Sequence, residues 1–114
     1  MKITHRDLVK KQTGIIPGAQ SVDKQILLGR ADGVPTFSMR LFSLKPGGYS
    51  PRHQHPFEHL IYVLEGRGLA VGGEGETPLV PGNVMLVEPG EEHQLKNDGD
   101  TDFCFLCLVP RDYE

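Results

Sequence analysis

The sequence predicts an all-β fold, built as a barrel or sandwich of short strands. Apolar runs of strand length are separated by turn sequences about every 8–12 residues, a spacing typical of these folds. The 114 residues include 14 glycines and 9 prolines, as expected where many tight turns join strands. We therefore expect about eight to ten strands and no substantial helix.

The length and charge of the chain limit its organisation and its partners. A chain of 114 residues suits one domain, with residues 1–35 forming an N-terminal arm and edge strands and residues 36–114 forming the barrel. The formal net charge of −3 and the lack of a basic patch argue against nucleic acid as a partner. No apolar run approaches the ~18 residues of a membrane span, and no signal-peptide core is present. We expect no membrane partner and a cytoplasmic location.

The predicted strands are apolar runs bounded by glycine, proline and asparagine. They are expected at residues 25–28, 36–44, 58–64, 84–87, 93–97 and 103–109, with a hairpin in the glycine-rich segment 66–75. Alternation along a strand places His59 and Ile61 on one face and Tyr62 on the other. The segment Val84–Val87 is apolar throughout, so we expect a buried strand there.

Arg40 is the only charged residue within the predicted strand 36–44. Two interpretations remain open at this position. A long cationic side chain can run along the barrel wall and place its head at the rim. It can also point into the cavity and bind an anionic ligand, and Arg40 would then be a substrate-binding residue of a catalytic site.

Cys104 and Cys107 form a C-x-x-C sequence inside the apolar run 103–109. A redox dithiol or half of a zinc site needs a turn or a helix start at this sequence. Residues three apart on a strand lie roughly 10 Å apart on opposite faces, beyond the reach of a disulfide. We therefore expect separate thiols, one inside the barrel and one packed outside.

Four of the five histidines form a spaced pattern. His53, His55 and His59 lie within seven residues, and His93 follows a Pro-Gly turn further along the chain. Neutral imidazole is the commonest protein ligand of transition metals, and a metal site needs several on a rigid scaffold. We therefore predict a metal held inside a β-barrel. His5 stands alone in the polar N-terminal segment and is expected at the surface.

These residues resemble the two sequence motifs of the cupin family. The first motif, G-x5-H-x-H-x3,4-E-x6-G, fits residues 47–66, and the second, G-x5-P-x-G-x2-H-x3-N, fits residues 82–97. Both match in spacing and order, and the flanking strands extend the likeness over nearly the whole chain. The resemblance implies a cupin jelly-roll β-barrel that binds a metal through its motif residues.

Two positions depart from the cupin motifs. Glu88 replaces the first proline of the second motif, which is a change within a turn. His59 replaces the motif glutamate, and strand alternation points the neighbouring Glu58 away from the other ligands. The sequence resembles the small single-domain cupins with four-histidine manganese sites, and the implied metal ligands are His53, His55, His59 and His93.

The resemblance also suggests what surrounds the metal. Phe105 and Cys107 match cavity-facing residues of the similar small cupins, so they are expected to line the cavity, with Cys107 serving in packing. Strand parity then turns Cys104 and Leu106 outward. Carboxylates or backbone carbonyls should orient the histidine rings, and Glu92 is one candidate.

The predicted ligands limit the chemistry of the site, but they do not identify the metal. Four neutral imidazoles leave a divalent ion with its full charge, which favours anionic or oxygen-donor ligands. Four protein ligands around an octahedral ion leave two neighbouring positions for a substrate and dioxygen. A closed tetrahedral zinc site would instead be structural. Iron, nickel, copper and zinc all suit imidazole, and manganese is implied by the resemblance alone.

We therefore expect a metal-dependent oxidoreductase of the dioxygenase type, acting on a small anionic or carbonyl-bearing molecule. The alternative is a non-catalytic cupin that binds a metal or a small metabolite, because fold and metal do not determine the reaction. Exposed sheet edges favour pairing of two chains, so we also expect a homodimer with residues 15–30 as the contact.

Overall fold

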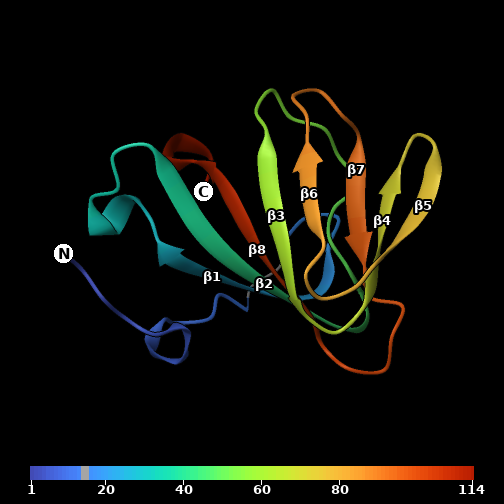
Figure 1. Cartoon of the computed structure of the whole chain (residues 1–114), viewed down its shortest axis with the longest axis horizontal. Coiled ribbons are helices and arrows are strands. Elements are labelled where there is room, and N and C mark those ends of the chain that lie inside the picture. Colours follow the sequence, from blue (N-terminus) through green and yellow to red (C-terminus); the bar gives the residue numbers. More distant parts are fainter. Residues whose placement is uncertain (14–15) are drawn as a thin grey trace.

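The protein is described by a computed structural model, shown in Figure 1, that covers residues 1–13 and 16–114. Residues 14 and 15, which belong to the predicted N-terminal arm and contact segment, lie outside the described residues. The strands are β1 (Gln20–Leu28), β2 (Phe37–Tyr49), β3 (His59–Glu65), β4 (Gly68–Gly72), β5 (Gly75–Leu79), β6 (Val84–Val87), β7 (His93–Lys96) and β8 (Phe103–Pro110).

The all-β prediction is confirmed. The helical elements among the described residues are three short 3-10 helices at Arg6–Leu8, Arg30–Asp32 and Arg111–Tyr113. None of the helices in this part of the chain is long and apolar enough to cross a membrane.

Strand β2 joins two parts of one curled antiparallel sheet. Its first part, residues 37–44, pairs with β1 and with β8, and β8 continues into β3 and then β6. Its last residue, Tyr49, pairs with β7, which continues into β4 and β5. The change of partner follows Gly47, whose φ of +79° favours glycine. Figure 1 shows the resulting curl, with β1, β2 and β8 on one side and β7, β4 and β5 on the other.

Alternate side chains of β8 fill the interior of this curl. Phe103, Phe105, Cys107 and Val109 are each at most 3% exposed. They form one hydrophobic cluster with residues of the neighbouring strands, including Leu44, Ile61, Val63, Val87 and Leu95. Complete burial of a large apolar side chain contributes roughly 1.5–3 kcal/mol. Strand β8, held between β2 and β3, is therefore the central wall of the barrel.

The two cysteines lie on opposite faces of β8, as predicted, and both thiols are free and buried. Cys107 belongs to the interior cluster. Cys104 packs on the other face, where its Sγ donates a hydrogen bond to Ser43 Oγ at 3.4 Å.

The prediction that Val84–Val87 is a buried strand is wrong. The side chains of Val84 and Leu86 are 73% and 55% exposed, and Val87 alone is fully buried. The reason is the face on which they lie: Val84 and Leu86 are on the outer face of the sheet, where their partners Tyr62 and Leu60 on β3 are also exposed. A strand with one uncovered face can be apolar on that face without being buried.

The N-terminal segment packs along β1. Gln12 and Lys24 exchange two backbone hydrogen bonds of 2.7 and 3.2 Å, and Gln25 Nε2 donates to the carbonyl oxygens of Arg6 and Val9. Among the described residues, Gln12 is the one that pairs with the free side of β1. The homodimer through residues 15–30 remains a prediction.

Candidate metal centre

Three of the four predicted ligands lie close together. One ring nitrogen from each of His53, His55 and His93 lies within 4.8 Å of those of the other two. The ring centroids are 5.0 Å apart for His53 and His55, 4.9 Å for His53 and His93, and 4.8 Å for His55 and His93. Two nitrogens bound to one ion lie about 3 Å or more apart. Small ring rotations would therefore let these three histidines share a metal.

Backbone hydrogen bonds hold these histidines in place. His53 and His93 exchange two, of 3.2 and 3.0 Å, which join the loop before β3 to the start of β7. The amide of Gly90 donates to the carbonyl oxygen of His55 at 2.8 Å. Gly90 has a φ of +78°, which glycine adopts without strain. The Pro-Gly turn of the second motif thus supports a ligand of the first.

Backbone carbonyls determine the tautomers of two rings. His55 Nδ1 lies 2.9 Å from the carbonyl oxygen of Phe57, and His93 Nδ1 lies 2.9 Å from that of Glu91. A carbonyl oxygen only accepts, so each Nδ1 donates its proton and each Nε2 keeps a lone pair. Nε2 of His55 is buried and has no hydrogen-bond partner among the described residues. A divalent metal fits this donor set, because it would bind a lone pair that nothing else satisfies.

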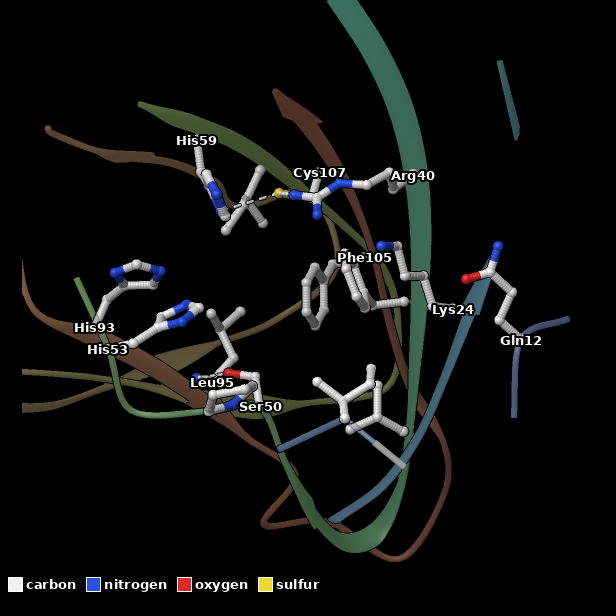
Figure 2. A pocket seen from close by; sticks show the side chains of 15 residues that line it. Gln12, Lys24, Arg40, Ser50, His53, His59, His93, Leu95, Phe105 and Cys107 are labelled. Carbon is white, nitrogen blue, oxygen red and sulfur yellow. Dashed lines mark hydrogen bonds between the residues drawn. The ribbon is translucent and has the colours of Figure 1, made fainter. Parts of the chain in front are cut away.

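His59 lies beside these three rings, outside the close group. Its centroid is 4.1 Å from that of His55 and 5.4 Å from that of His93. Its Nδ1 lies 3.3 Å from Cys107 Sγ, as Figure 2 shows. The predicted face is confirmed, since His59 and Ile61 are buried while Tyr62 is 46% exposed. The four-histidine ligand set remains a prediction.

Burial favours the neutral form of His53, His59 and His93. It lowers the pKa of His59 to about 2, and the positive charge of Arg40 is the next cause. Burial also lowers the pKa of His53 and His93, with smaller contributions from neighbouring histidines. Neutral imidazole is the form that binds a metal, so the site needs no deprotonation near neutral pH.

We expect the metal-free chain to lose stability as the pH falls from 7 to 5. The pKa values of His53, His59 and His93 are lower in the folded chain than the ordinary 6.5. Below pH 6.5 the unfolded chain therefore binds more protons than the folded chain does, and stability falls with pH. His59 and His93, which are buried, each contribute up to about 1.4 kcal/mol per pH unit, and the exposed His53 contributes less because solvent screens its charge.

Urea unfolding of the metal-free chain at pH 7 and pH 5 measures this loss. A His59→Gln variant should lose less stability on acidification, because glutamine does not titrate. His5→Gln, a change at an exposed residue, serves as the control and should match the unsubstituted chain. Equal free energies of unfolding at both pH values would contradict the prediction.

A cavity of about 310 Å³ lies beside the histidines (Figure 2). Phe105 and Cys107 of β8 line it, together with Arg40 of β2. Arg40 is only 6% exposed, and its Nη2 donates to Cys107 Sγ at 3.0 Å. Its guanidinium carbon lies 4.9 Å from the ring centre of Phe42. Of the two interpretations of Arg40, the structure supports the inward one, with the head group in the cavity and not at the rim.

The rings of His55 and His93 are oriented by backbone carbonyls, one of the two kinds of partner expected, whereas the carboxylate candidate Glu92 pairs with Arg52 at 2.7 Å. One feature of the site was missed from the sequence, because Lys24 also lines the cavity. It was overlooked because β1 begins at Gln20 and not at residue 25. The alternation of Val22, Lys24 and Ile26 is the signal that could have found it.

The fold and the site together define a class, a small antiparallel β-barrel with a histidine cluster beside an interior cavity. Residues 40–109 match the family model described as the cupin domain. The chain belongs to the cupin family, and the sequence resemblance is confirmed at that level.

Three similar proteins show how wide this family is. The polyketide cyclase RemF from Streptomyces resistomycificus is 32% identical, with a TM-score of 0.91 over 96% of this chain and 79% of that one. A 1-methylthio-D-xylulose 5-phosphate methylsulfurylase from Rhodospirillum rubrum is 31% identical over 102 residues, which is 90% of this chain and 64% of that protein. The oxalate-binding protein of Thermotoga maritima is 34% identical over 74 residues, 61% of each chain. The chain thus spans less than two thirds of these two curated relatives.

Proposed function

We propose that the chain is a metal-dependent enzyme that acts on a small anionic or carbonyl-bearing molecule in the cavity. The observation that carries the proposal is the buried, unpartnered Nε2 of His55, which lies within a group of three histidines. A histidine cluster that served only the stability of the fold would not need a cavity beside it, and here a cavity of about 310 Å³ adjoins the histidines. A divalent metal bound there would supply Lewis acidity to an oxygen atom of the substrate.

The cavity residues would bind and orient the substrate. Phe42, Phe105 and Ile61 form an apolar wall that excludes water from the bound molecule. The head group of Arg40 would hold a carbonyl or anionic oxygen and so set the orientation of the substrate toward the histidines. No aspartate or glutamate lines the cavity in the described part of the chain, so a proton carrier of ordinary carboxylate type is absent from this wall.

The reaction type that the sequence predicts is oxidation by dioxygen. Its support is the ligand chemistry: an ion held by neutral imidazoles alone keeps its charge and has room for further ligands. Manganese, iron or copper could take part in this redox reaction, whereas zinc, which has no redox chemistry, would suit a non-redox use of the same ligands. A second candidate is a non-redox reaction, or binding without turnover. The names of two relatives, a polyketide cyclase and an oxalate-binding protein, favour this second candidate.

One experiment separates these functions. The chain is loaded under anaerobic conditions with manganese, iron or zinc, and a catechol or a β-diketone is added as probe. Oxygen is then admitted and its uptake is followed with an electrode, while product is followed by mass spectrometry. Oxygen uptake that depends on both metal and probe supports the oxidoreductase. Product formation without uptake supports the non-redox reaction, and binding without product supports the binding protein.

Replacing His59 by alanine tests the four-histidine ligand set. If His59 is a ligand, the variant should bind manganese at least about 10-fold more weakly, because even the outer partners of a metal site contribute 10- to 100-fold. Competition with a chromophoric chelator measures the affinity. A Tyr62→Ala change, on the outer face of the same strand, is the control. Full metal affinity in His59→Ala would restrict the ligands to His53, His55 and His93.

A further inference from the structure

The cavity wall carries positive charge and no acidic residue. Arg40 and Lys24 both line it, and in the described part of the chain no aspartate or glutamate does. Glu114 is near enough to act on Lys24 through its charge. Its carboxylate, however, accepts hydrogen bonds from the hydroxyl of Ser38 and the amide of Arg30, outside the cavity lining.

Neither cation has a counter-ion in the structure. Within the described residues, no carboxylate oxygen lies within 4.0 Å of a nitrogen of Arg40 or Lys24. Nε of Arg40 is buried and has no hydrogen-bond partner. Burial, together with the charge of Arg40, lowers the pKa of Lys24. Two cations that face each other without a counter-charge are costly to bury, and a bound anion would offset that cost.

The two ends of the cavity offer different chemistry. In Figure 2, the head groups of Arg40 and Lys24 lie at one end, and His53 and His93 lie at the other. Phe105 lies between them, on the apolar wall. A molecule that fills the cavity would therefore meet His53 and His93 at one end, an aromatic surface in the middle and two cations at the other end, where Cys107 links Arg40 to His59.

We propose that Arg40 and Lys24 form an anion subsite that binds the carboxylate of the substrate, while the opposite end of the same molecule reaches the histidines. The substrate class is thus a small aromatic or unsaturated carboxylate with an oxygen-bearing group at its far end. This inference rests on the proposed function, because it takes the cavity as the substrate site. The planar guanidinium of Arg40 keeps free N–H donors besides the one that bonds Cys107, so it can hold the two oxygens of a carboxylate.

Benzoate is the probe, because it carries the carboxylate and the aromatic ring and lacks the oxygen-bearing group at the far end. Its binding is measured by calorimetry on the metal-free and the metal-loaded chain, with neutral benzamide as the matched ligand. We expect benzoate to bind and benzamide to bind at least about 10-fold more weakly, because a hydrogen bond to a charged group is lost. Equal binding of the two ligands, or tighter binding of inorganic phosphate than of benzoate, would overturn the assignment.

Two variants locate the subsite. Lys24→Gln and Arg40→Gln should each weaken benzoate binding about 10-fold or more, and binding of benzamide should change little. Lys10→Gln makes the same charge change at an exposed residue outside the cavity and should bind benzoate as the unsubstituted chain does. Circular dichroism checks that each variant is folded, and Lys24→Met provides a second neutral variant. Benzoate binding that is unchanged in both cavity variants would place the carboxylate on the metal instead and would overturn the subsite.

Metal binding is measured on the same samples by chelator competition, so that the two proposals fail separately. If benzoate binding depends on Arg40 and Lys24 but no metal binds, the subsite stands and the proposed function fails. If a metal binds but benzoate binding is independent of both cations, the proposed function stands and the subsite is overturned.

Discussion

Replacing His55 by alanine should weaken metal binding by at least about 100-fold. This ring lies at the centre of the histidine group, and its Nε2 is the buried atom without a partner. Its tautomer is held by the carbonyl of Phe57, so the lone pair is available without rearrangement. Loss of an outer partner of a metal site costs 10- to 100-fold, and loss of a ligand should cost at least as much.

Chelator competition with manganese and zinc measures this loss, and the metal content of the purified variant gives an independent check. His5→Ala removes an exposed histidine outside the group and is the control. A fold comparison of the metal-free chains by circular dichroism separates a lost ligand from a lost structure. Metal affinity in His55→Ala equal to that of the unsubstituted chain would rule out the proposed centre.

Replacing Phe103 by alanine should lower the free energy of unfolding by about 3–5 kcal/mol, the usual cost of removing a buried aromatic ring. Phe103 is fully buried, and its ring packs at a tilt of 45° against that of Phe105, with the ring centres 5.3 Å apart. The Phe103 ring packs directly against the backbone of Gly68, where a Cβ would lie 2.5 Å from the ring. Gly68 has no side chain that could move into the space, so removal of the ring leaves a void at this contact.

Phe37→Ala is the matched control, because Phe37 is 54% exposed on the same sheet. It should cost about 1 kcal/mol or less. Urea unfolding of the two metal-free variants under identical conditions gives the comparison. A loss for Phe103→Ala no larger than that for Phe37→Ala would contradict the packing described for the barrel.

The strands could be predicted because their signal is local. Alternation along β3 depends only on neighbouring residues, and it placed His59 and Ile61 on the interior face. The family resemblance placed Phe105 and Cys107 in the cavity, and alternation along β8 then turned Cys104 and Leu106 outward. The histidines were found from the spacing within two separate motifs, and the fold brings three of the four close together. The prediction that failed, the burial of β6, depended on segments far away in the sequence. The apolar residues of β6 are exposed because no strand or helix covers that face, which composition alone does not reveal.

How the side chains are arranged within the site was harder to predict than which residues form it. Strand parity gives the face of His59 but not how far its ring lies from those of His53 and His93. The carbonyls of Phe57 and Glu91 that orient the rings belong to the backbone. Every residue has such a carbonyl, so the residue types do not show which ones bond the rings. Lys24 was not predicted to line the cavity because β1 begins before the apolar run from which the strand was predicted.

The backbone bonds between His53 and His93 link two segments about 40 residues apart in the sequence. A metal held by His53, His55 and His93 would join the same two segments in the folded state, because the three ligands come together only when the chain is folded. An ion that binds only the folded state stabilises it by about 2.7 kcal/mol when present at 100 times its dissociation constant. The amount of folded protein in a cell would then follow the supply of metal.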